Sequence, residues 1–298
     1  MQKLFQQLKN GEKLAYIKSG HGNTNMILIH GNYASSLQFL QLINQLNPEV
    51  YTIYAVDLRC FGDSTCYRKV TSIDDYVEDI TRFIKALDIK DPHLVGFSLG
   101  GGVALQLCGY HPEKFKTLTL ISSITHRGYA LYKKDDEGNT LMADTYQSAD
   151  ELRADPDVKP ILNAIENKNI DGVIDFMDKN FFHGHRPDND DYYLSLINEV
   201  MKLRGLPEAI FAIAAFNMDS GHNFYTAGNH TINFIKLPVL HLVGVNDILT
   251  PREMVLDNYY ALKDNSRLIE YGGFGHSLLY QLPEEIAKHI TMFIRNVL

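Results

Sequence analysis

Three residues of the types used in acyl transfer each follow a separate strand-like run. Ser98 lies in the sequence Gly-Phe-Ser-Leu-Gly, between an apolar run and a segment of small residues, whereas Asp247 and His276 stand on turns after later apolar runs. Ligand crevices lie outside the carboxyl ends of parallel strands, so we expect the three side chains to meet there. A serine nucleophile needs a base, which histidine can supply near neutral pH, and an aspartate can orient that histidine. The predicted chemistry is attack by Ser98 on a carbonyl carbon.

The residues around this serine fit a sharp turn from a strand into a helix. Gly96 and Gly100 lack the Cβ atoms that would collide where strand and helix approach each other. Gly-x-Ser-x-Gly in this context is a nucleophile elbow, which exposes the serine hydroxyl. The oxyanion that forms on attack needs hydrogen-bond donors, and we expect one from the backbone N–H of Leu99. We expect the other from Asn32, in the loop after an earlier strand, with neighbouring Tyr33 as the alternative.

Alternating strand-like and helical patterns are expected to position these residues. The predicted strands span residues 14–18, 26–29, 51–56, 93–97, 118–121, 238–243 and 267–271. Helical patterns follow Ser35, Ser72 and the serine elbow, and others cover residues 252–262 and 283–297. This alternation predicts an α/β fold with a mostly parallel central sheet and helices on both faces.

The alternation stops at about Thr125 and resumes at about Ile235. The residues between lack strand-like runs and contain helical stretches at 149–154, 160–166, 173–180, 192–204 and 207–217. This segment is neither of low complexity nor rich in glycine and serine, as a linker would be. We therefore predict a helical cap of residues 125–234, inserted into a core formed by residues 1–124 and 235–298.

Composition excludes several classes of function. The 298-residue chain has a formal net charge of −8 and no dense block of lysine and arginine, which argues against nucleic-acid binding. No apolar run approaches the roughly 18 residues of a membrane span, and the polar N-terminus is unlike a signal peptide. The three cysteines contain no CxxC pair, so we expect reduced thiols in a cytoplasmic protein. A disulfide between Cys60 and Cys66 is conceivable but not expected.

The motifs closely resemble those of the α/β-hydrolase superfamily over essentially the whole chain. The matching segments are His30-Gly31-Asn32, Asp57 to Ser64, Gly96 to Gly101, Asn246-Asp247 and Gly275-His276. Cys60 stands where the family usually has glycine, which questions the geometry of that turn. The resemblance implies an α/β-hydrolase fold with a cap after the sixth strand, and hydrolysis through an acyl-enzyme without metal or organic cofactor. The Asn32 loop also resembles that of haloalkane dehalogenases, but Ser98 replaces their aspartate nucleophile, which disfavours dehalogenation and epoxide opening.

Other candidate residues are given structural roles. Asp219 competes for the role of the catalytic acid but follows no clear strand, so we interpret it as a cap or hinge residue. We expect an ion pair between Asp57 and Arg59 to brace their loop, and hydrogen bonds from His30 to hold the oxyanion loop. The two histidines of residues 183–185 lack a third ligand nearby, which favours a solvated loop over a metal site.

We predict a serine hydrolase that cleaves a small or medium carboxylic ester as its small-molecule substrate. A few cap aromatics are expected to line an apolar acyl pocket. One alternative keeps the triad but acts on a C–C bond, a lactone or a peracid-forming reaction. Such carboxylate-bearing substrates need a cationic anchor, for which the cap offers few arginines: Arg127, Arg153, Arg186 and Arg204. Another alternative is a ligand receptor on the same fold. The protein is expected to be a monomer or a homodimer.

Overall fold

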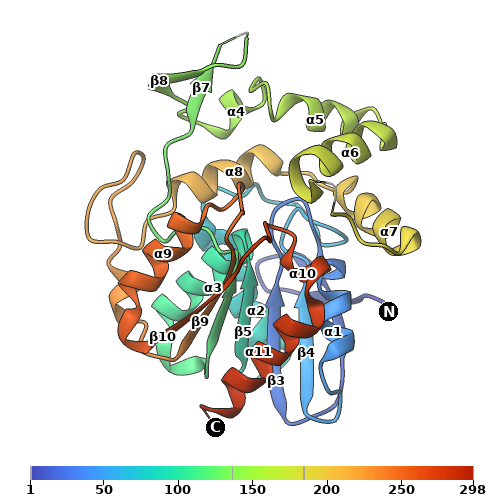
Figure 1. Ribbon diagram of the computed structural model, residues 1–298, viewed down its shortest axis with the longest axis vertical. Coiled ribbons are helices and arrows are strands. Elements are labelled where there is room, and N and C mark those ends of the chain that lie inside the picture. The colour runs from blue at the N-terminus through green and yellow to red at the C-terminus, as the bar shows by residue number, and fades with distance from the viewer. Residues whose placement is uncertain (1, 136, 184, 298) are drawn as a thin grey trace.

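The computed structural model describes residues 2–135, 137–183 and 185–297, and a twisted sheet forms its centre (Figure 1). Among these residues, eight strands pair in the order β1-β2-β4-β3-β5-β6-β9-β10. They are β1 (Leu4–Gln7), β2 (Lys13–Ser19), β3 (Thr24–Ile29), β4 (Tyr51–Val56), β5 (His93–Phe97), β6 (Leu118–Ile121), β9 (Val239–Gly244) and β10 (Ser266–Tyr271). Within this eight-stranded sheet, only the pairings of β1 with β2 and of β2 with β4 are antiparallel. The predicted mostly parallel sheet is confirmed, and β1 is an additional edge strand.

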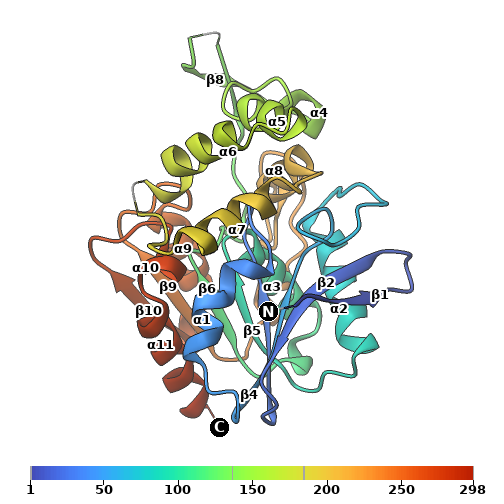
Figure 2. The ribbon, with the colours of Figure 1, turned by 90° about the vertical axis from the view of Figure 1, so that its right-hand side faces the viewer.

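Helices cover both faces of this sheet. In Figure 2, α1 and α11 lie on one side and α2 on the other, where α2 packs against α3. The core helices are α1 (Leu40–Gln45), α2 (Ile73–Ala86), α3 (Leu99–Tyr110), α9 (Arg252–Ala261), α10 (Leu278–Gln281) and α11 (Pro283–Arg295). Short 3₁₀ turns are η1 (Ser36–Phe39), η2 (Pro112–Lys114), η4 (Thr231–Phe234) and η5 (Lys263–Asn265). None of the helices in the described part of the chain has both the length and the apolar character that crossing a bilayer requires.

Local sequence explains where α2 begins. The Asp75 carboxylate accepts hydrogen bonds from the backbone N–H groups of Thr71 and Ser72, at 2.7 and 3.3 Å. Acidic residues in a first helical turn also oppose the positive end of the helix dipole. The apolar residues of α2 recur at helical spacing and are buried against the sheet. The predicted start of this helix is therefore confirmed.

A long segment between β6 and β9 lies beyond the carboxyl ends of the parallel strands (Figure 1). Its helices are α4 (Ala149–Leu152), α5 (Lys159–Glu166), α6 (Ile170–Met177), α7 (Asp190–Val200) and α8 (Leu206–Ala215), and the π-helical turn η3 (Asp178–Phe182) continues α6. Each predicted helical stretch of the segment overlaps one of these helices, with bounds that differ by up to four residues. Helices α7 and α8 are drawn nearer the sheet than α4 and α5, which lie farthest out (Figure 2).

The prediction that this segment lacks strands is wrong. β7 (Tyr132–Lys134) and β8 (Thr140–Thr145) form an antiparallel hairpin. Asp135 closes its turn by accepting backbone hydrogen bonds from Glu137 and Asn139. The residues of β8 are largely exposed, so no buried face imposes the apolar alternation by which a strand is recognised in a sequence.

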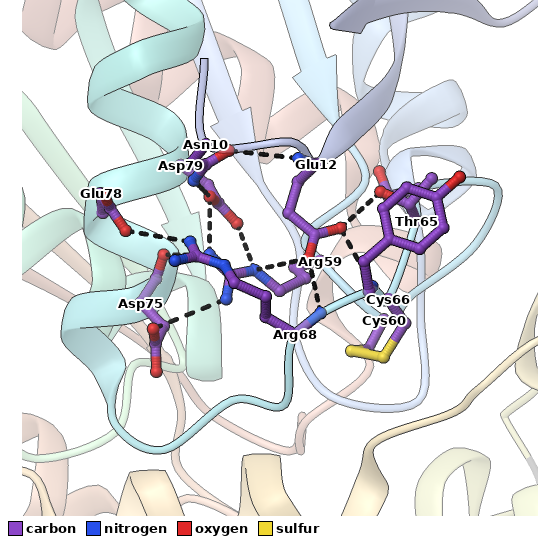
Figure 3. Close-up of polar contacts among 12 residues, drawn as sticks. Asn10, Glu12, Arg59, Cys60, Thr65, Cys66, Arg68, Asp75, Glu78 and Asp79 are labelled. Carbon is purple, nitrogen blue, oxygen red and sulfur yellow. Dashed lines mark hydrogen bonds and ion pairs between the residues drawn. A yellow bond between two sulfur atoms is a disulfide. The ribbon is translucent and has the colours of Figure 1, made fainter. Parts of the chain in front are cut away.

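Arg59 is fully buried in the loop after β4, where it pairs with α2 (Figure 3). Its Nε and Nη2 atoms each lie 2.7 Å from a carboxylate oxygen of Asp79. Asp57 instead pairs with Lys3, at 2.7 Å. The predicted Asp57–Arg59 ion pair is therefore wrong, because the two side chains leave the loop toward different partners.

A disulfide joins Cys60 and Cys66 in the same loop, so the expectation of three reduced thiols is wrong. The backbone N–H of Cys60 donates to the carbonyl of Thr65 at 3.0 Å, which folds the chain back and brings the two cysteines together. Cys60 has a φ of 70°, a left-handed conformation that glycine adopts most easily. With two of the three cysteines joined, reduced thiols no longer support a cytoplasmic location.

Replacing Arg59 with leucine should lower the free energy of unfolding by about 3 kcal/mol, because Asp79 would be left as an unpaired buried carboxylate. Urea denaturation measures the loss. The matched control is Arg82→Leu, since Arg82 is partly exposed and pairs with Glu78 on the surface of α2. That change should cost less than about 1 kcal/mol. Equal losses in the two variants would contradict a special role for the buried pair.

Candidate active site

Ser98 lies at the junction of β5 and α3 in a strained conformation, with φ of 53° and ψ of −118°. The surrounding packing imposes this turn. A Cβ on Gly96 would lie 2.4 Å from the carbonyl oxygen of Gly100, and a Cβ on Gly100 would lie 2.0 Å from that of Ile29. Both contacts are far too short, so glycine is required at each position. The side chain of Ser98 is thereby held at the carboxyl end of the sheet.

His276 and Asp247 occupy turns beyond the ends of β10 and β9 and form a buried pair. His276 Nδ1 lies 2.8 Å from Asp247 Oδ2, and each residue is 5% exposed. The ring of Phe97 packs against the imidazole with a centroid separation of 4.8 Å. Phe181, from the π-helical turn, packs against it edge-on at 5.4 Å. An Nδ1–H that donates to the carboxylate leaves Nε2 free to accept a proton.

Thr250 completes the surroundings of Asp247. Its hydroxyl lies 2.9 Å from Asp247 Oδ2 and 3.2 Å from His276 Nδ1, and its backbone N–H donates to Asp247 Oδ1 at 2.9 Å. Burial opposes ionisation of Asp247, but His276 and the hydrogen bonds from Thr250 outweigh it and hold the pKa of the carboxyl below its usual value. Sequence reasoning missed Thr250. The available signal was a threonine three residues after an aspartate on a turn.

Ser98, His276 and Asn32 line one cavity of about 180 Å³. The rest of its wall is mostly apolar and includes Ile124, Tyr129, Phe181, Ile210, Ile213 and Met254. Asp247 lies behind His276 and does not line this catalytic cavity. Within the described residues, no hydrogen bond joins the hydroxyl of Ser98 to His276. Such contacts often tighten only when substrate is bound.

Two backbone groups were expected to bind an oxyanion at this cavity. Leu99 begins α3, so its N–H has no partner within the helix, while its side chain is fully buried. Asn32 lines the cavity from the loop after β3, and its side-chain oxygen is buried without a hydrogen-bond partner in the described structure. The adjacent alternative, Tyr33, lines the cavity too, with a φ of 53°. The loop therefore brings both candidates beside the serine.

His30 holds this loop from within the core. Its Nδ1 donates to the carbonyl of Gly31 at 2.7 Å, and its Nε2 accepts from the backbone N–H of Leu58 at 2.9 Å. Burial lowers the pKa of His30, which favours the neutral ring that this donor and acceptor pattern requires. The expected structural role of His30 is confirmed.

The remaining polar candidates lie away from the serine. Asp219 pairs with Arg127 at 3.2 Å and does not line the catalytic cavity. His183 and His185 line a neighbouring groove, and Gly184 lies outside the described residues. In the described chain, one group of three or more potential metal ligands has its ligand atoms within 4.8 Å of one another, namely Asp57, Asp63 and Glu199. Lys3 Nζ already contacts all three, at 2.5 to 2.9 Å.

Comparisons with known proteins agree with the observed fold. The family model for the alpha/beta hydrolase fold matches residues 24–283. A bifunctional esterase/perhydrolase from Acinetobacter calcoaceticus is 24% identical, covering 97% of this chain and 98% of that protein. A pimeloyl-acyl-carrier-protein methyl ester esterase from Neisseria meningitidis is 27% identical, covering 91% of this chain and 77% of that protein. The solved structure of an esterase from Exiguobacterium antarcticum has a TM-score of 0.73 at 19% identity, covering 99% of this chain and 100% of that one.

Replacing Thr250 with valine removes the hydroxyl while preserving the shape of the side chain. A hydrogen bond to a charged group contributes roughly 1.5 to 3 kcal/mol, so we expect kcat/KM for an ester substrate to fall about tenfold or more. Thr250→Ser keeps the hydroxyl and should retain most of the activity. Steady-state kinetics of the two variants checks this. An equal kcat/KM for Thr250→Val and the unchanged protein would show that the Thr250 hydroxyl does not assist the His276–Asp247 pair in catalysis.

Proposed function

The chain belongs to the alpha/beta-hydrolase fold family, and we propose that it is a serine hydrolase that cleaves short-chain carboxylic esters through an acyl-enzyme. The observation that carries the proposal is one shared cavity, lined by the strained Ser98 and by His276. The Nδ1 atom of this histidine contacts the buried carboxylate of Asp247. The similarity to proteins described as esterases supports the same reaction class.

The proposed reaction proceeds in two halves. His276 Nε2 takes the proton of the Ser98 hydroxyl as its oxygen attacks the ester carbonyl, and Asp247 stabilises the imidazolium that forms. The N–H groups of Leu99 and Asn32 stabilise the resulting oxyanion. The intermediate collapses to an acyl-enzyme while His276 returns the proton to the departing alcohol. Water, activated by the same imidazole, then releases the acid and regenerates Ser98.

We further propose that residues 125–234 act as a cap over this site. Helix α8 contributes Ile210 and Ile213 to the catalytic cavity, and the π-helical turn contributes Phe181. These side chains exclude water from one side of the serine, which strengthens the electrostatic interactions within the site. The cap also restricts the size of the substrate.

The size and polarity of the catalytic cavity support a short, uncharged acyl group. Its volume of about 180 Å³ is below the roughly 300 to 1,000 Å³ typical of sites for drug-sized ligands. No lysine or arginine is among the described residues that line it. A substrate carboxylate would therefore lack a cationic partner there, which disfavours the C–C bond hydrolase alternative. The buried His276–Asp247 pair beside Ser98 likewise disfavours a receptor without catalytic activity.

Replacing Ser98 with alanine should abolish hydrolysis of p-nitrophenyl acetate while leaving the thermal unfolding midpoint close to that of the unchanged protein. A fluorophosphonate probe should modify the unchanged protein on the peptide that contains Ser98, and peptide mass spectrometry locates the adduct. Ester turnover well above background in Ser98→Ala would refute the proposed nucleophile. An unmodified Ser98 after probe treatment would favour the receptor alternative.

A series of p-nitrophenyl esters tests the size of the acyl site. We expect kcat/KM to be highest for acetate to butyrate and to fall at least about tenfold for decanoate, because the longer chain exceeds the cavity. Ile213→Ala enlarges the cavity and should shift the preference toward longer chains. A preference for decanoate in the unchanged protein would contradict the assignment of this cavity to the acyl group.

A further inference from the structure

A disulfide joins the two ends of the loop from Cys60 to Cys66 (the disulfide loop). Arg204, in the inserted segment, binds this loop at three points. Its backbone N–H donates to the carbonyl of Cys60 at 3.2 Å, and its guanidinium donates to the carbonyls of Gly62, at 3.2 Å, and Ser64. All three acceptors lie within the ring that the disulfide closes. The disulfide loop is therefore the binding site of Arg204 on the core.

This contact lies at the start of α8. Gly205 follows Arg204 in the chain and is the N-cap residue of α8. A Cβ on Gly205 would lie 3.2 Å from the Cβ and 3.4 Å from the Sγ of Cys60, so the backbone there packs directly against the disulfide. The same helix contributes Ile210 and Ile213 to the catalytic cavity. The disulfide loop thus supports the helix that forms one wall of that cavity.

Cys60 is held in a conformation that a residue with a Cβ disfavours. Its φ of 70° lies in the left-handed region, which persists only where the surrounding structure imposes it. Two links impose it here, namely the disulfide and the hydrogen bond from the Cys60 N–H to the carbonyl of Thr65, at 3.0 Å. Reduction breaks the covalent link. Relaxation of φ would then turn the Cys60 carbonyl away from Arg204.

The structure around the disulfide loop has supports of its own (Figure 3). The buried carboxylate of Glu12 accepts hydrogen bonds from the Thr65 hydroxyl and from the backbone N–H groups of Tyr67 and Arg68. On the other side, Arg59 is fixed by its buried ion pair with α2. We therefore expect loss of the disulfide to loosen the contact with the inserted segment without unfolding the core.

The two sulfurs differ in their access to a reductant. Cys66 is partly exposed, whereas Cys60 is 1% exposed. We propose that the Cys60–Cys66 disulfide is a redox-sensitive restraint on α8, and that its reduction by small thiols slows ester hydrolysis by loosening the cap. This proposal rests on the proposed hydrolase function and on the proposed cap.

The reduction proceeds by two thiol–disulfide exchanges. A thiolate of the reductant attacks Cys66 Sγ, and Cys60 leaves as a thiolate that takes up a proton. A second thiolate then attacks the sulfur of the reductant in the mixed disulfide. Cys66 leaves as a thiolate, which is protonated in turn, and the reductant becomes a disulfide. The protein thereby gains two electrons and two protons.

Two single variants test the restraint alongside protein reduced with dithiothreitol. Both Cys60→Gly and Cys66→Ser remove the disulfide, but glycine adopts a φ of 70° without strain, whereas Cys60 in Cys66→Ser does not. In the reduced protein and in Cys66→Ser, we expect backbone amide hydrogen exchange over residues 204–210 to become about tenfold faster. In both, kcat/KM for p-nitrophenyl acetate should fall about threefold. Cys60→Gly should stay within about twofold of the oxidised protein in both measurements, with or without dithiothreitol.

The outcomes separate this proposal from the proposed function. Unchanged hydrogen exchange in the reduced protein and in Cys66→Ser would overturn the restraint, and faster exchange with an unchanged kcat/KM would overturn its effect on hydrolysis. Equal acceleration of exchange in Cys60→Gly and Cys66→Ser would contradict the role given to the conformation of Cys60. Absence of ester turnover in the oxidised protein, with Ser98 unmodified by a fluorophosphonate, would instead refute the hydrolase proposal, while the exchange measurement still tests the restraint.

Discussion

The close approach of β5, α3 and β3 is the constraint on which the rest of the site depends. Gly96 and Gly100 leave no room for a side chain, and the contact with Ile29 forces the turn between them into a sharp bend. The bend holds Ser98 at a positive φ and aligns the start of α3 with the same cavity. Local strain of this kind persists only when the surrounding packing imposes it. The buried sheet, apolar on both faces, provides that packing.

The sequence predicted this part of the molecule well because its signals are local. Buried parallel strands require continuous apolar runs, so β4, β5 and β6 were predicted with their observed bounds. The turns after β9 and β10 bring Asp247 and His276 to the same edge of the sheet as Ser98. This follows from topology, because the carboxyl ends of neighbouring parallel strands meet there.

The features that the sequence did not predict depend on contacts between distant segments or on exposed structure. Arg59 pairs with Asp79 rather than with nearby Asp57, because α2 packs directly beside the loop. The disulfide depends on a reversal of the chain at Cys60, which residue spacing alone does not specify. The exposed β8 hairpin has no apolar pattern.

In the proposed reaction, Ser98, His276 and the backbone N–H groups of Leu99 and Asn32 act on one ester carbonyl. A crystal structure of the protein inhibited by a phosphonate ester, a mimic of the tetrahedral intermediate, tests it most directly. We expect a covalent bond from Ser98 Oγ to phosphorus, with a phosphonyl oxygen within hydrogen-bond distance of both N–H groups. A phosphonate attached to another residue, or an oxygen directed away from Leu99 and Asn32, would contradict it.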